Sequence, residues 1–122
     1  MHPTVVADAG GLLTLSGTVE GIAHQANEIC AVDTSSLLLA EFLLWLHEGR
    51  PEHASVEFGI VSSRVQEWFP ARPVAIEAAM RRDDPDIPMD SVVALVLAES
   101  LRVPLVTKHR ELVSRKIPVL YA

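Results

Sequence analysis

The chain has 122 residues, 49% of them hydrophobic and 21% charged, which suits one domain of residues 1–122 and excludes disorder caused by low hydrophobicity. The longest apolar run, residues 92–98, is much shorter than the roughly 20 residues of a membrane span. The first residues show no signal-peptide pattern, and the single cysteine, Cys30, has no thiol partner. We therefore expect a cytoplasmic protein that does not enter a membrane.

The net charge of −6 is unevenly distributed. Residues 1–100 carry five basic and fifteen acidic side chains, whereas residues 101–122 carry five basic side chains and one acid, Glu111. The acidic total argues against extensive phosphate contacts. The basic C-terminal segment is compatible with a small phosphate-binding patch and equally with a solvated terminal face.

Apolar runs and helical patterns alternate along the chain. Short β-branched or apolar runs predict strands at 4–8, 29–33, 104–107 and 117–120. Helical spacing and capping residues predict helices at 12–17, 18–28, 34–48, 52–67, 73–82 and 89–101, with a turn at Gly10 and Gly11. This alternation predicts an α/β fold, a parallel sheet with helices on both faces. Ligands of such sheets bind at the carboxyl ends of strands, here Asp8 and residues 107–109.

Three acidic residues occupy positions that a solvated face does not explain. Asp8 ends the first predicted strand, Glu41 lies inside the apolar stretch 37–46, and Asp90 lies in the first turn of an apolar helix. That stretch predicts a helix that is apolar all round, so Glu41 should be largely buried, and its partner should come from elsewhere in the fold or be a metal. Taken singly, Asp8 is equally compatible with a helix cap, and Asp90 with a residue that stabilises the helix dipole.

Together, three carboxylates at one sheet edge would repel one another and favour a hard cation such as Mg²⁺. A bound ion can activate water and stabilise charge on a phosphate, which is the chemistry of phosphodiester hydrolysis. The basic side chains available for phosphate contacts are Lys108, Arg110, Arg115 and Lys116.

The order and spacing of four motifs resemble the PIN domain, a nuclease fold found in many prokaryotic toxins of toxin–antitoxin pairs. The motifs are residues 5–13 with Asp8, residues 36–41 with Glu41, residues 87–91 with Asp90, and residues 103–112. In the last motif, His109 stands where an acidic residue is common in the family. A neutral imidazole favours manganese or zinc over magnesium.

The resemblance implies a metal-dependent endoribonuclease, the toxin of a type II toxin–antitoxin system, with Mg²⁺ or Mn²⁺ as cofactor. It implies an RNA substrate, a cognate antitoxin and a homodimer. Asp8, Glu41 and Asp90 would be catalytic metal ligands, with His109 or Glu111 as a candidate further ligand. The substrate-binding residues would be Thr107, Lys108 and Arg110.

Two rival interpretations remain. Because of His109, the chain could be a catalytically degenerate PIN-like domain that only binds a partner or RNA. A phosphoacceptor receiver domain is disfavoured, because Ala9 and His109 stand where such domains have an acidic residue and a proline. We expect the apolar-run residues Leu38, Phe42, Trp45 and Trp68 to serve core or dimer packing rather than base stacking.

Overall fold

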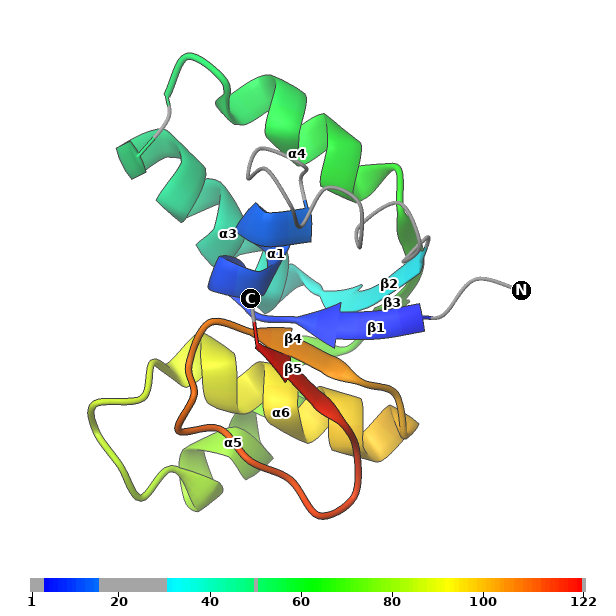
Figure 1. Ribbon diagram of the computed structural model, residues 1–122, viewed down its shortest axis with the longest axis vertical. Helices are drawn as coiled ribbons and strands as arrows, with labels where there is room; N and C mark the ends of the chain where they lie inside the picture. The colour runs from blue at the N-terminus through cyan, green and yellow to red at the C-terminus, as the bar shows by residue number, and fades with distance from the viewer. Residues whose placement is uncertain (1–3, 16–30, 50, 122) are drawn as a thin grey trace.

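The computed structural model describes residues 4–15, 31–49 and 51–121, which form three layers with a sheet in the middle (Figure 1). Five parallel strands make up the sheet in the order β3-β2-β1-β4-β5. Their bounds are β1 Thr4–Ala7, β2 Ala31–Ser35, β3 Val65–Phe69, β4 Leu105–Thr107 and β5 Val119–Tyr121. The predicted α/β class, with a parallel sheet between helices, is confirmed.

Helices cover both faces of the sheet (Figure 1). One face carries α1 (Ala9–Leu15), α3 (Ser36–Gly49) and α4 (Ala54–Ser62), and the other carries α5 (Ala71–Arg81) and α6 (Met89–Leu101). Successive side chains of a strand point to opposite faces. Accordingly, Val5 of β1 packs into the core with α1, α3 and α4, whereas Val6 packs into the core with α6. No helix in the part of the chain that the structure describes is long and apolar enough to cross a membrane.

One strand was missed in the sequence. The helix expected over residues 52–67 ends at Ser62, and residues 65–69 form the edge strand β3. Its three central side chains are exposed, so the strand lacks the apolar run that identified the others. The second expected strand lies at Ala31–Ser35 instead of 29–33, and the helix expected over 18–28 lies outside the described residues.

The predicted turn at Gly10 and Gly11 is also wrong, because α1 begins at Ala9 and contains both glycines. A Cβ atom on Gly11 would lie 2.2 Å from the carbonyl oxygen of Val106 in β4. Glycine therefore permits α1 to pack directly on the neighbouring strand. This contact places the N-terminus of α1 over the carboxyl edge of the sheet.

Candidate functional site

The candidate site lies where the strand order reverses. The chain runs outward from β1 to β2 and β3 on one side, and β4 and β5 fill the other side. In open α/β sheets, ligands bind outside the carboxyl ends of the strands at such a point. Asp8 directly follows β1 and Thr107 ends β4, and both side chains are buried.

Asp8 is held by three donors from three segments. Its Oδ1 accepts a hydrogen bond from the backbone N–H of Gly11 at 2.8 Å, which is a helix-capping contact. Its Oδ2 accepts from the hydroxyls of Ser91 at 2.7 Å and Thr107 at 2.6 Å. Hydrogen bonds to an ionised acceptor are the strong ones. Asp8 therefore caps α1 and also ties together the carboxyl edge of the sheet and the start of α6.

Asp90 approaches the same place from α6. Its Oδ2 accepts from the backbone N–H of Ala9, the first residue of α1, at 3.0 Å. Burial raises the pKa of Asp90, and the negative charges of Asp8 and Glu41 raise it further, whereas the hydrogen bond from Ala9 opposes the shift. Asp8 and Asp90 therefore both bind the first turn of α1, and the charge of Glu41 on α3 acts on Asp90.

Glu41 is less buried than the sequence led us to expect. The helix α3 is not covered all round, because Ala40 and Leu44 are exposed, and Glu41 is half-buried. Its Oε1 accepts from the indole Nε1 of Trp45, one turn later, at 3.3 Å. The expectation that its partner comes from elsewhere in the fold is therefore wrong for this donor, which lies one turn along the same helix.

Thr107 connects Asp8 to the segment that follows β4. Its Oγ1 donates to Asp8 and accepts from the backbone N–H of His109 at 3.0 Å. The side chain of His109 is half-buried beside this link. Lys108 is exposed, and its Cγ and Cδ would lie 3.3 Å from a Cβ on Gly10, so its stem follows the start of α1.

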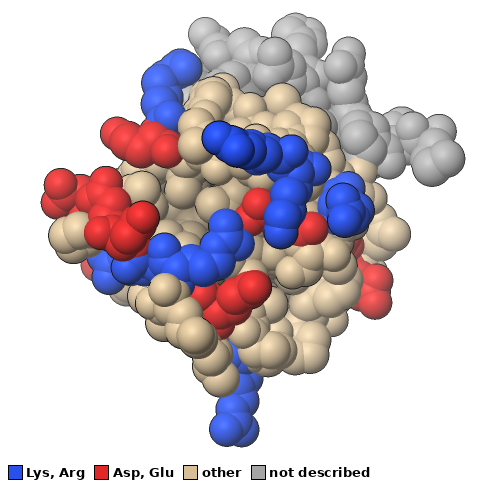
Figure 2. Space-filling view, turned by 90° about the horizontal axis from the view of Figure 1, so that it is seen from below, with Lys and Arg blue, Asp and Glu red and all other residues tan. Residues whose placement is uncertain are grey.

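The other predicted residues of this segment lie farther along the chain. The guanidinium of Arg110 lies 5.4 Å from the ring centre of Tyr121, within cation–π range. Glu111 is exposed and lines a hollow together with Arg81 and Arg82, to which Asp8 and Asp90 do not contribute. Figure 2 shows acidic groups among the Lys and Arg side chains on the lower face of Figure 1. This face therefore carries mixed charge.

Within residues 4–15, 31–49 and 51–121, no group of three or more His, Cys, Asp or Glu side chains forms a ready-made metal site. The donor set nevertheless fits Mg²⁺, which prefers carboxylate oxygens and keeps several of its waters in proteins. Each protein donor described above occupies only part of a carboxylate, which has about four acceptor positions. The carboxylates of Asp8, Glu41 and Asp90 therefore keep acceptor positions that these donors do not use, and the three residues stay the predicted metal ligands.

The sequence analysis missed two residues that hold the carboxylates of the candidate site, Ser91 and Trp45. Ser91 is 99% buried and donates to Asp8, but a serine in a first helical turn is normally only a surface or capping residue. Trp45 lies four residues after Glu41, and this spacing brings two side chains of a helix together. The helical spacing of Trp45 was a signal available in the sequence, whereas the contact between Ser91 and Asp8 depends on the tertiary fold.

Leu38 and Phe42 are buried in the core as predicted, but Trp68 is 57% exposed.

No family model matches the sequence, and no curated protein matches it significantly. The structure is similar to that of PAE2754 from Pyrobaculum aerophilum, with a TM-score of 0.64 and 23% identity over 98% of this chain and 92% of that chain. It is also similar to VapC20 of Mycobacterium tuberculosis, described as a sarcin-ricin loop cleaving toxin. There the TM-score is 0.60 and the identity 14%, over 88% of this chain and 89% of that chain. The chain has a PIN-like fold. The PIN-like fold agrees with the resemblance of the sequence motifs. Asp8 lies at the carboxyl edge of its sheet, and the neighbouring Ala9 binds Asp90.

Proposed function

We propose that this chain is a metal-dependent endoribonuclease and the toxin of a type II toxin–antitoxin pair. The observation that carries the proposal is the meeting of Asp8 and Asp90 at the first turn of α1, where Gly11 N–H binds Asp8 and Ala9 N–H binds Asp90. The charges of Asp8 and Glu41 also contribute to the raised pKa of Asp90. Carboxylates that repel one another favour the binding of a divalent cation. Similarity in fold to VapC20, a toxin described as cleaving the sarcin-ricin loop, supports the choice of RNA as substrate.

In this proposal, Asp8, Glu41 and Asp90 hold Mg²⁺ or Mn²⁺. Such an ion, when bound, lowers the pKa of a water molecule and stabilises negative charge on a phosphate. The hydroxyls of Ser91 and Thr107 fix one oxygen of Asp8, so that its carboxylate cannot rotate. Pre-positioned ligands of this kind reduce the cost of ordering the site when the substrate arrives.

Phosphate contacts are assigned to Lys108 and Arg110. Both side chains are exposed. Lys108 directly follows Thr107 at the end of β4, and Arg110 lies over Tyr121 at the end of the neighbouring strand β5. Between them, His109 is the better candidate for a further metal ligand, because its backbone is bonded to Thr107, whereas Glu111 lines a different hollow.

The proposed partners and location follow the PIN-domain resemblance. They are a cognate antitoxin, a second copy of this chain in a homodimer, and the cytoplasm. An antitoxin that inhibits by occupying the acidic site would present a basic or aromatic segment to it, because such a segment complements the charge of the three carboxylates.

A second candidate function keeps the fold without the activity. His109 replaces the usual fourth acid, and within the described residues the three carboxylates do not form a ready-made metal site. These observations favour a domain that only binds RNA or a partner protein. The two candidates differ in what they predict for cleavage and for metal binding.

The test is a nuclease assay on a mixed RNA pool with Mg²⁺ and with Mn²⁺. The wild type should cleave RNA, and Glu41→Gln should lose at least about 100-fold in rate, since removing one electrostatic contributor commonly costs this much. Glu77→Gln is the matched control, because Glu77 is exposed on α5. A gain of activity in His109→Asp would identify His109 as a weakened fourth ligand. Equal inactivity of the wild type and Glu41→Gln would refute the nuclease proposal.

A further inference from the structure

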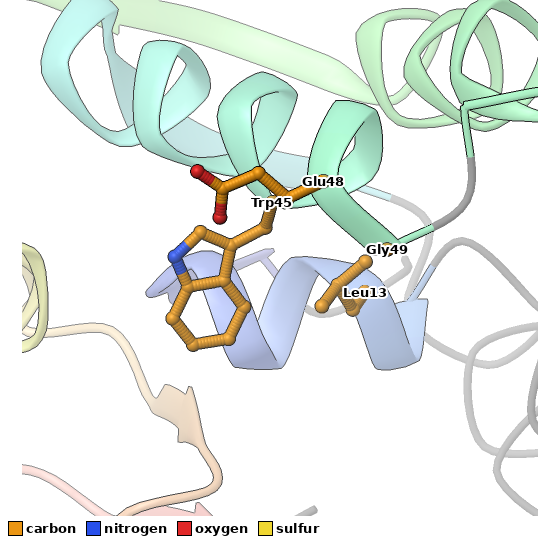
Figure 3. A pocket seen from close by; sticks show the side chains of 4 residues that line it. All are labelled: Leu13, Trp45, Glu48 and Gly49. Carbon is orange, nitrogen blue, oxygen red and sulfur yellow. The ribbon is translucent and has the colours of Figure 1, made fainter.

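A hollow of about 390 Å³ lies beside the candidate site. The described residues that line it are Leu13 of α1 and Trp45, Glu48 and Gly49 of α3. Figure 3 shows the indole of Trp45 projecting from α3 beside α1, with its ring to one side of Leu13. The volume lies in the range of small-molecule sites, which are mostly apolar with a few polar groups. The hollow is therefore large enough to hold a nucleobase.

Trp45 connects the hollow to the acidic centre. Its Nε1–H donates to Oε1 of Glu41, so one edge of the indole contacts a proposed metal ligand while the ring lines the hollow. The sequence favoured a packing role for Trp45 over base stacking, but its ring is half-buried, packs against the core only in part and also lines the hollow. Lys108 lies against Gly10 at the start of α1, whereas Leu13 lies in the next turn of that helix. The basic side chain and the hollow therefore flank the same short helix.

We propose that this hollow binds an unpaired base of the RNA, stacked on Trp45. This inference rests on the proposed ribonuclease function. A phosphate is disfavoured here, because Glu48 lines the hollow and Glu41 lies at the edge of the indole. A base is uncharged and offers a flat face to the indole. Its N–H groups can donate hydrogen bonds to a carboxylate. The substrate class is then RNA with an accessible unpaired nucleotide, because a base in a duplex cannot stack on a side chain.

The assignment gives Trp45 two separable roles. Its ring binds the base, and its N–H orients Glu41 as a positioning contact. Trp45→Phe keeps a ring and loses the N–H, so it should retain KM within about three-fold and lower kcat. Trp45→Leu loses the ring as well, so its KM should rise about ten-fold, in line with the usual loss when a stacking aromatic is removed. A purely structural role would not separate the two variants in this way.

Direct binding tests the base itself. The wild type is titrated in EDTA, which prevents metal-dependent cleavage, with a single-stranded oligoribonucleotide of about eight nucleotides and with an abasic strand of equal length and charge. The normal strand should bind about ten-fold more tightly, and Trp45→Leu should bind both strands equally. The control is Trp68→Leu, because Trp68 is exposed on the edge strand β3. This control should retain the preference for the normal strand.

The outcomes separate this inference from the proposed function. Equal affinity of the wild type for the two strands, or an unchanged preference in Trp45→Leu, overturns base stacking even where the nuclease assay shows cleavage. Loss of the preference in Trp68→Leu would move the base to β3 and also overturn it. If the wild type binds neither strand, the inference fails, and the nuclease assay then decides whether the proposed function fails as well.

Discussion

Asp90→Asn should stabilise the metal-free protein. Burial and two neighbouring carboxylates raise the pKa of Asp90, so the folded chain binds this proton more tightly than the unfolded chain does. Stability therefore falls as the pH rises from the ordinary aspartate pKa through the raised one, and it remains reduced at pH 7. Asparagine keeps an oxygen that can accept from Ala9 and removes the charge. Its advantage in melting temperature should be present at pH 7 and shrink in acid, where Asp90 is protonated.

Added metal should reverse this ranking. For 122 residues, an unfolding entropy of about 2.1 cal/mol/K per residue means that 1 kcal/mol changes Tm by about 4 °C. An ion present at about 100 times its Kd stabilises the folded state by about 2.7 kcal/mol. Thermal melts of the wild type in Mg²⁺ or Mn²⁺ should therefore rise by about 10 °C above the value in EDTA. Asp90→Asn should rise by less than about 3 °C.

The matched control is Asp86→Asn, the same change at an exposed position before α6. It should show the metal response of the wild type. If the wild type does not respond to metal, or if Asp90→Asn responds as strongly, Asp90 is not a metal ligand. If Asp90→Asn is less stable than the wild type in EDTA at pH 7, the burial and repulsion of an ionised Asp90 are not the dominant cost at this site.

Three further substitutions test the surroundings of the site. Thr107→Val removes the hydroxyl that donates to Asp8. It should lower the free energy of unfolding in urea by about 2–3 kcal/mol. A loss below about 0.5 kcal/mol would show that this contact is not a strong charge-assisted bond. Gly11→Ala places a methyl group against the Val106 carbonyl, 2.2 Å away. It should lower the free energy of unfolding by about 3 kcal/mol or more. Unchanged urea unfolding would contradict the direct packing of α1 on β4. On β2, burial and the charge of Glu67 raise the pKa of Asp33. Glu67→Gln should therefore raise the free energy of unfolding at pH 7 by about 0.2–1 kcal/mol. This gain should shrink in acid as the Asp33 carboxyl takes up its proton, and a gain that persists unchanged in acid would exclude charge repulsion as its cause.

The central strands and the longest apolar helix could be predicted because burial leaves a strong sequence pattern. Val5, Val6, Leu105 and Val106 lie in continuous apolar runs, as expected for strands covered on both faces. The edge strand β3 lacks this pattern, because its side chains Gln66 to Trp68 are exposed. Its place in the sheet comes from backbone pairing with β2, which leaves little trace in side-chain polarity.

The candidate site could be predicted in its carboxylates but not in its supporting contacts. Asp8 and Asp90 stood out because each adjoins an apolar element, and Glu41 because it interrupts one. Ser91 gave no such signal, since its hydroxyl acquires a role only when α6 is packed beside Asp8, 83 residues away in the chain. The burial of Glu41 was overestimated because composition does not reveal which side of an apolar helix remains uncovered.

The donors that surround the two aspartates do not neutralise their charge, which agrees with the proposed binding of a cation. Asp8 and Asp90 receive backbone N–H groups from the first turn of α1, whose dipole stabilises nearby negative charge. Hydroxyls and N–H groups satisfy hydrogen bonds without cancelling charge. Among the described residues, no lysine or arginine forms an ion pair with Asp8, Glu41 or Asp90, whereas Arg81 pairs with Glu99 at 2.8 Å elsewhere on α5 and α6. Repulsion among the three carboxylates therefore stays uncompensated within the described fold, and a divalent ion would supply the missing positive charge.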